Sequence, residues 1–150
     1  ATRRGPPKGQ RLHDPAAGRS PPDSLADYAP GFTENTLLII TIEGVPAVET
    51  LDRILDVPDI DSVLIGPHDL SCSLGKPEQY NDPAFLETAE TIFTKARAKG
   101  IGAGIHAWGD TASQARFVNM GANLLLHKAD IIFFKNGVRD EWPDIRSKLG

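Results

Sequence analysis

The sequence predicts an α/β fold in which parallel strands alternate with helices, and three observations point to it. Residues 37–43 form an apolar run rich in β-branched side chains, typical of a strand buried on both faces of a parallel sheet. Stripes of apolar residues at helical spacing alternate with such runs along the chain. No glycine-rich phosphate-binding fingerprint follows the first strand, which disfavours a dinucleotide-binding fold. This alternation predicts right-handed βαβ units, and four of them are half of an eight-fold barrel.

The first 36 residues differ from the rest of the chain and are expected to form a proline-rich loop or partly disordered segment. They hold half of the 12 prolines and show no apolar periodicity, so they cannot bury much apolar surface. Residues 24–28 are the exception, because they could form one short helical turn. The domain itself is expected to span residues 37–150.

The first two βα units are expected between residues 37 and 74. After the first strand, apolar side chains at helical spacing predict a helix over residues 45–55, and Pro46 suits its first turn. Pro58 and Asp59 break the chain before a second strand at residues 62–65. Gly66 and Pro67 close that strand, and a short helical turn is expected to follow.

The second half of the domain repeats the pattern. Asp82 is expected to cap a helix that begins at Pro83 and ends at Gly100. A third strand is predicted at residues 101–105, and a fourth at residues 123–126. The other expected elements are a helix from Asp110 or Thr111 to Met120, a helical turn at residues 130–134 and a polar helix near residues 141–149. The expected core side chains are Phe85, Ala89, Ile92, Phe93, Ala96, Phe117, Phe133 and Phe134.

Composition excludes several classes of protein. The chain is 40% hydrophobic and 24% charged, which is typical of soluble globular domains. A net charge of −4 gives no basic face for nucleic acid. No apolar stretch approaches the ~20 residues of a membrane span, and no secretory signal is apparent. The single cysteine, Cys72, fits a reducing compartment and favours a cytoplasmic protein. The missing initiator Met indicates processing or a chain that is part of something longer.

Polar side chains stand where the predicted strands end, which is where parallel α/β folds bind ligands. Glu43 closes an apolar strand, where an unpaired carboxylate would be costly. Asp69 follows the neighbouring strand, and two carboxylates with open positions suit Mg²⁺ or Mn²⁺. Alternatively, Glu43 caps a helix or pairs with an arginine. The turn from Gly66 to Asp69 could bind an anion through its backbone N–H groups, or could be an ordinary turn that Asp69 caps.

Other reactive side chains carry weaker hypotheses. The four histidines have no close ligand spacing, so a zinc site is not expected. His106 and His127 fall near strand ends, where a structural or solvated role is favoured over substrate contact, whereas His68 has a stronger case from its place in the turn. Lys128 is a poor Schiff-base candidate because its flanks are polar. Cys72 is more simply a packed side chain than a reactive thiol.

Two motifs together give the sequence a resemblance to a known family. A strand ending in Ile42-Glu43 is followed by the segment AVETLDRIL at residues 47–55. The second motif is VLIGPHDLS at residues 63–71, followed by LGKP at residues 74–77. From about Pro6 to Asp130 the sequence resembles the HpcH/HpaI aldolases, which are class II pyruvate aldolases. The resemblance implies a TIM-type (β/α)8 barrel, of which this chain is the C-terminal half.

The resemblance also implies an activity and a site. The family cleaves a 4-hydroxy-2-oxo acid to pyruvate and an aldehyde through a metal-bound enolate, which makes the protein a carbon–carbon lyase. Glu43 and Asp69 match the family's metal ligands, for Mg²⁺ or Mn²⁺ and as a further option Co²⁺. Gly66, Pro67, His68 and Asp69 match the turn that receives the substrate carboxylate. Thr41 stands where the family usually has a glutamine that contacts pyruvate.

Departures from the family pattern keep alternatives open. The residue between Pro67 and Asp69 is commonly small, so His68 could narrow the pocket or reach the substrate. The family's catalytic base, a His, and its Arg lie in the other half of the barrel, so the chain is expected to begin mid-barrel. It could be a catalytically incomplete domain that binds metal or a partner chain, or a relative of citryl- or malyl-CoA lyases. Family members form hexamers that exchange C-terminal helices, so a homo-oligomer with Phe133, Phe134 and Trp142 in its contacts is expected.

Overall fold

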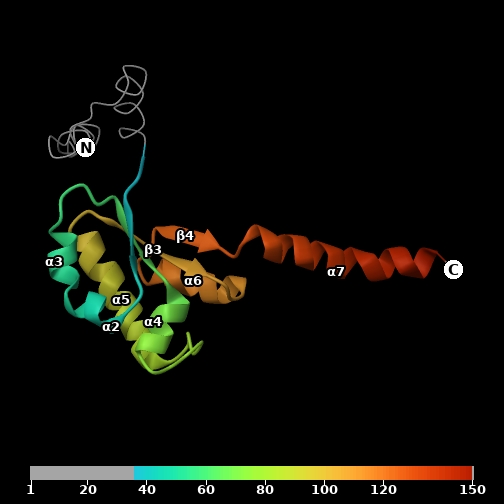
Figure 1. The fold of residues 1–150 in the computed structure, drawn as a ribbon, viewed down its shortest axis with the longest axis horizontal. Coiled ribbons are helices and arrows are strands. Elements are labelled where there is room, and N and C mark those ends of the chain that lie inside the picture. The colour runs from blue at the N-terminus through green and yellow to red at the C-terminus, as the bar shows by residue number, and fades with distance from the viewer. Residues whose placement is uncertain (1–35, 150) are drawn as a thin grey trace, which may run out of the picture.

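The computed structural model describes residues 36–149, and the expected loop and helical turn before residue 36 lie outside the described residues. Four strands form one parallel sheet in the order β1-β2-β3-β4 (Figure 1). They are β1 (Ile39–Ile42), β2 (Ser62–Ile65), β3 (Gly102–Ala107) and β4 (Leu124–His127). Consecutive strands are neighbours, and all three pairs are parallel. The predicted alternating α/β fold is therefore confirmed.

The two faces of the sheet differ, because successive side chains of a strand point to opposite sides. One face packs on the helices through fully buried side chains such as Ile42, Val63 and Ile105. On the other face, Thr41 lies beside Leu64, Leu64 beside Gly104, and Gly104 beside Leu124. In a closed barrel such a row would be one layer of the interior. Thr41 is exposed and Leu64 is only half-buried in this chain.

Helix α5 (Pro83–Ala98) supplies most of the core, as the sequence predicted. Asp82 caps it by accepting a hydrogen bond from the N–H of Ala84 at 2.9 Å, and Pro83 occupies the first turn. All five predicted core positions on this helix are fully buried. They pack beneath β2 and β3, so the helix fixes the level at which those strands end.

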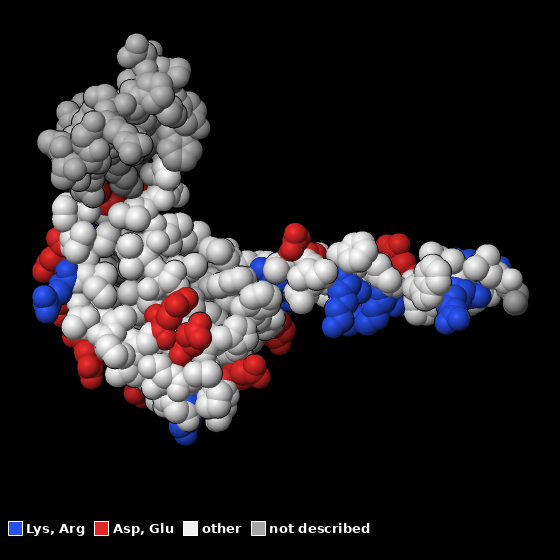
Figure 2. Space-filling model, in the orientation of Figure 1, with Lys and Arg blue, Asp and Glu red and all other residues white. Residues whose placement is uncertain are grey.

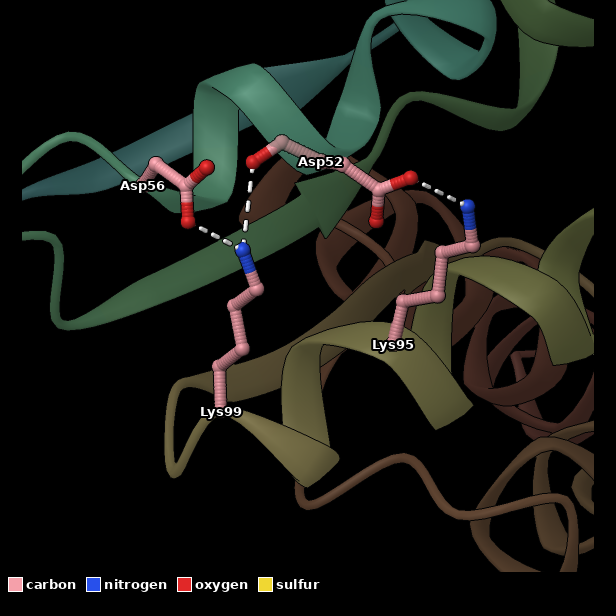
Figure 3. Close-up of polar contacts among 4 residues, drawn as sticks. All are labelled: Asp52, Asp56, Lys95 and Lys99. Carbon is pink, nitrogen blue, oxygen red and sulfur yellow. Dashed lines mark hydrogen bonds and ion pairs between the residues drawn. The ribbon is translucent and has the colours of Figure 1, made fainter.

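Salt bridges join α5 and the residue after it to the segment of α3 (Leu51–Leu55) and Asp56 (Figure 3). Lys95 donates to the carboxylate of Asp52 at 2.8 Å. Lys99 pairs with Asp56 and also donates to the backbone oxygen of Asp52 at 3.2 Å. Exposed pairs of this kind contribute little individually, so burial of apolar side chains is the main interaction that holds the helices in place.

The expected single helix over residues 45–55 is divided in two, α2 (Val45–Glu49) and α3, which is a correction. Thr50 lies between them with φ −103° and ψ 13°, outside the helical range. The observed strand boundaries also differ from the predicted ones by a few residues. Strand β1 is shorter than expected, and β3 extends to include His106 and Ala107.

Residues 130–148 form one long helix, α7 (Asp130–Lys148), instead of the predicted turn and separate polar helix. Gly137 and Pro143 disfavour helix but do not forbid it, because each costs a limited amount locally. Figure 1 shows α7 projecting away from the sheet. Phe133 and Phe134, predicted to be core, are 51% and 69% exposed on this helix, so that prediction was wrong.

The two remaining helices are α4 (Pro67–Ser73), directly after β2, and α6 (Thr111–Asn119), between β3 and β4. Within residues 36–149, no helix is long and apolar enough to cross a membrane.

Candidate active site

A shallow pocket of about 280 Å³ lies at the carboxyl ends of the first three strands. Every residue that the sequence singled out for metal or substrate binding lines it. Because parallel strands end at the same edge of the sheet, residues distant in sequence meet here. The lining residues are Thr41, Glu43, Leu64, Ile65, Gly66, Pro67, His68, Asp69, His106 and Trp108.

Glu43 lies directly over the backbone of Gly66. A Cβ atom placed on Gly66 would be 2.7 Å from both Cγ and Oε1 of Glu43, so only glycine leaves room for this side chain. Within residues 36–149 Glu43 forms no salt bridge, and α2 is capped by Gly44 without a side-chain hydrogen bond. The helix-cap alternative for Glu43 is therefore wrong, and its carboxylate faces the pocket uncompensated by a described arginine.

Asp69 lies in the first turn of α4 and is not its cap. The cap position is Gly66, and no side chain caps this helix. The part of that alternative in which Asp69 caps the turn is therefore wrong, and anion binding by the turn stays a prediction. The backbone N–H groups of the first helical turn have no partner inside the helix, so they are free to face a ligand.

Three hydrogen bonds hold α4 in place beside Glu43. The hydroxyl of Ser73 accepts from the N–H of Val45 at 3.0 Å, which ties the end of α4 to the loop after β1. The buried hydroxyl of Ser71 donates to the carbonyl oxygen of His68 at 2.8 Å and accepts from the N–H of Glu78 at 3.0 Å. The two carboxylate-bearing segments are thus fixed relative to each other by the backbone.

Three aromatic side chains, His68, His106 and Trp108, line the pocket, and Tyr80 contacts His68 from outside that lining. Nδ1 of His68 is 2.5 Å from the hydroxyl of Tyr80, and its ring centroid is 5.8 Å from that of Trp108. Trp108 lies against His106 with the centroids 4.4 Å apart. Nε2 of His106 donates to the carbonyl oxygen of Lys128 at 2.8 Å. We call His68, Tyr80, His106 and Trp108 the aromatic wall.

Burial raises the pKa of the Tyr80 hydroxyl, and the nearby Glu78 and Cys72 add to the effect. Tyr80 therefore keeps its proton at neutral pH and can donate it. Sequence reasoning missed Tyr80, because it stands in a loop with no periodicity to place it. Its partner His68 was the only available signal.

His127 and Lys128 do not line this pocket. Nδ1 of His127 is 2.7 Å from Oε1 of the buried Gln114, and its ring lies against Phe133. Lys128 adopts a positive φ of 53° just after β4, and its carbonyl oxygen is the acceptor for His106. The favoured structural reading of His127 fits these contacts, whereas His106 is part of the pocket.

Glu43 and Asp69 are the carboxylates of this pocket, and no group of three or more His, Cys, Asp or Glu in residues 36–149 could hold a metal ion. Mg²⁺ and Mn²⁺ are commonly held by one or two carboxylates, with water and substrate oxygens completing the shell. A pair of carboxylates at an open pocket therefore fits such an ion better than Zn²⁺, which prefers more nitrogen or sulfur ligands.

A second, larger pocket of about 550 Å³ lies behind the aromatic wall. Pro67 and Trp108 line both pockets. Its other walls come from residues 78–82 and from α6, where Arg116 donates to the side chain of Asn81 at 2.5 Å. No sequence motif indicated this pocket, because loop residues without periodicity form much of it.

A family model for HpcH/HpaI aldolase/citrate lyase matches residues 2–130. The chain belongs to this family. The resemblance read from the two motifs is thereby confirmed. An HpcH/HpaI aldolase also appears among the solved structures that the chain matches.

Two curated relatives are hydroxypyruvate/pyruvate aldolase of Agrobacterium fabrum and 2-keto-3-deoxy-L-rhamnonate aldolase of Escherichia coli K12. The first is 32% identical over 135 residues, covering 89% of this chain and 50% of the relative. The second is 34% identical over 143 residues, covering 88% and 54%. The chain thus spans about half the length of these relatives.

A solved structure agrees with this placement. The HpcH/HpaI aldolase from Desulfitobacterium hafniense superimposes with a TM-score of 0.70 at 29% identity, covering 84% of this chain and 49% of that chain. The described sheet and helices therefore correspond to about half of a barrel-like aldolase.

Proposed function

We propose that this chain is the C-terminal half of a metal-dependent carbon–carbon lyase that cleaves a 4-hydroxy-2-oxo acid to pyruvate and an aldehyde. The observation that carries the proposal is the placement of Glu43 and Asp69 in one pocket, with the carboxylate of Glu43 over Gly66. Aldolase names among the relatives support the reaction class. The proposed ion is Mg²⁺ or Mn²⁺, for which a carboxylate pair is suited.

Each residue has a distinct role in this proposal. Glu43 and Asp69 hold the metal ion, whose Lewis acidity would polarise the keto oxygen of the 2-oxo acid. The backbone N–H groups in the turn from Gly66 to Asp69 receive the carboxylate of the acid. Thr41, one layer deeper on the open face of the sheet, offers its hydroxyl to the same acid.

Metal binding tests the site without requiring turnover. We expect the chain to bind Mn²⁺ and Glu43→Gln or Asp69→Asn to weaken binding at least tenfold, because each removes a charged ligand. Electron paramagnetic resonance of free Mn²⁺ gives the dissociation constants. Glu49→Gln is the matched control, because Glu49 is exposed on α2 and does not line the pocket. Unchanged Mn²⁺ affinity in both site variants would show that these carboxylates hold no metal.

The chain is also proposed to associate with copies of itself. Apolar side chains follow one side of α7 at intervals of three and four residues, as a helix that packs on a partner requires. All are at least 44% exposed. They are Ile131, Phe134, Val138, Trp142, Ile145 and Leu149.

A further inference from the structure

His68 is the side chain of the proposed carboxylate-binding turn that can reach along the substrate. Its backbone is fixed by the hydrogen bond from Ser71 to its carbonyl oxygen. Its ring is held from one side by Tyr80 and from another by Trp108. An otherwise exposed imidazole is therefore confined to one orientation at the pocket wall.

The contact with Tyr80 also leaves one ring nitrogen of His68 for a ligand. Nδ1 of His68 is hydrogen-bonded to the hydroxyl of Tyr80. Within residues 36–149, no hydrogen-bond partner is described for Nε2 of His68. Nε2 is therefore the atom of this ring that can bind a group of the substrate.

We propose that His68 is a specificity-determining residue whose Nε2 forms a hydrogen bond with a hydroxyl on C3 of the 2-oxo acid. This inference rests on the proposed function, in which the acid's carboxylate is bound by the backbone of the same turn. The carbon chain of an acid bound there would lie beside the ring of His68, which lines the same pocket. The site would therefore prefer 3-hydroxy-2-oxo acids to unsubstituted ones.

A purely structural reading competes with this one. The hydrogen bond between His68 and Tyr80 also ties α4 to residues 78–82, and that alone could explain the pair. The two readings differ in what removal of the ring would do. A structural tie lowers stability and affects all ligands equally, whereas a substrate contact changes the preference between two acids.

Calorimetric titration of the Mn²⁺-loaded chain with 3-hydroxypyruvate and with pyruvate distinguishes the substrate contact from the structural tie. We expect hydroxypyruvate to bind about fivefold more tightly, the amount that one net hydrogen bond supplies. His68→Ala should bring the ratio of the two dissociation constants to one, because it removes the side chain that is proposed to bind the C3 hydroxyl. Tyr80→Phe should reduce the ratio in part, because the ring stays but is no longer oriented.

His127→Ala is the matched control, since His127 also pairs with a side chain but lies outside the pocket, and it should keep the ratio. Thermal unfolding verifies that each variant is folded. The inference would be overturned if the unaltered chain bound pyruvate and 3-hydroxypyruvate equally well, or if His68→Ala kept the preference for 3-hydroxypyruvate. Neither result would bear on the metal site. Failure of both acids to bind the folded, Mn²⁺-loaded chain would instead refute the proposed function, and the inference with it.

Discussion

The contact between Glu43 and Gly66 shows how one residue without a side chain can position a charged one. Glu43 follows β1 and Gly66 follows β2, and the parallel register of Ile42 with Ile65 brings the two positions side by side. The space that a larger residue would fill at position 66 is occupied by the side chain of Glu43. The glycine is therefore part of the proposed metal site although it offers no ligand.

Gly66→Ala tests this role. The new methyl group would displace the Glu43 carboxylate, so we expect Mn²⁺ affinity to fall roughly tenfold, as is common when the support of a ligand is lost. Stability should change little, because Glu43 is exposed and can move aside. Gly137→Ala is the control: its Cβ would meet open space on α7, so it should leave Mn²⁺ binding unchanged. Equal Mn²⁺ affinity in the two alanine variants would contradict the positioning role.

Among the site residues, the sequence predicted the carboxylate pair, the turn with His68 and the strand-end position of His106, but not Tyr80. Glu43, Gly66 and Asp69 stand at strand ends, so the alternation of strands and helices was enough to gather them. Tyr80 contacts His68 from a loop, and Trp108 lies one residue beyond a strand that proved longer than expected. Loop conformations depend on contacts made after the elements pack, and sequence periodicity does not encode them.

At the scale of elements, helix α6 depends on a charged cap whose effect varies with pH. Asp110 caps α6, and its carboxylate accepts hydrogen bonds from both the hydroxyl and the N–H of Ser113. These bonds lower the pKa of the Asp110 carboxyl below its usual value. A lowered pKa in the folded state means that the carboxylate stabilises the fold above its usual pKa and that this contribution is lost on further acidification.

Comparison of the chain with Asp110→Asn measures this effect. Asparagine keeps the capping oxygen but cannot be protonated in this range. We expect the melting temperature of Asp110→Asn to fall less than that of the unaltered chain between pH 7 and pH 3, and to be lower at pH 7. Circular dichroism melts at several pH values provide the comparison. A steeper fall in the variant would reverse the assigned direction of the pKa shift.

Two elements show where local patterns mislead. The apolar stripe over residues 45–55 is regular, yet Thr50, with φ −103° and ψ 13°, separates α2 from α3. Conversely, residues 130–148 form one helix although it contains Gly137 and Pro143. Helix boundaries depend on small local energies, of about 1 kcal/mol for a glycine, that an apolar pattern does not report.

At the scale of the whole molecule, the described sheet has one open face and ends in the edge strands β1 and β4, and helix α7 extends away from it. Figure 2 shows basic side chains gathered along one side of α7 and acidic ones elsewhere on it. No residue of α7 is buried, so the apolar stripe from Ile131 to Leu149 is exposed. Among residues 36–149, β1 and β4 have no further strand beside them and the apolar stripe is uncovered, and both features favour association with another chain.

Sedimentation velocity tests the proposed self-association. We expect a mass above the 16.2 kDa of one chain. Changing Phe134 and Trp142 together to lysine should shift the chain towards the monomer, because two charges would interrupt the apolar stripe. Changing Asn136 and Ser147 to lysine adds the same charge on the opposite side of α7 and should leave the mass unchanged. A monomer for the unaltered chain at micromolar concentration would refute the proposal.

The sequence by itself determined the order of strands and helices, the parallel sheet, the core side chains of α5 and the family. These follow from periodicity and from two motifs, which are properties of neighbouring residues. Only the tertiary structure decided that Glu43 lies over Gly66, that Tyr80 orients His68, and that Phe133 and Phe134 are exposed on one long helix. Those features depend on which distant surfaces meet, and packing between elements sets that.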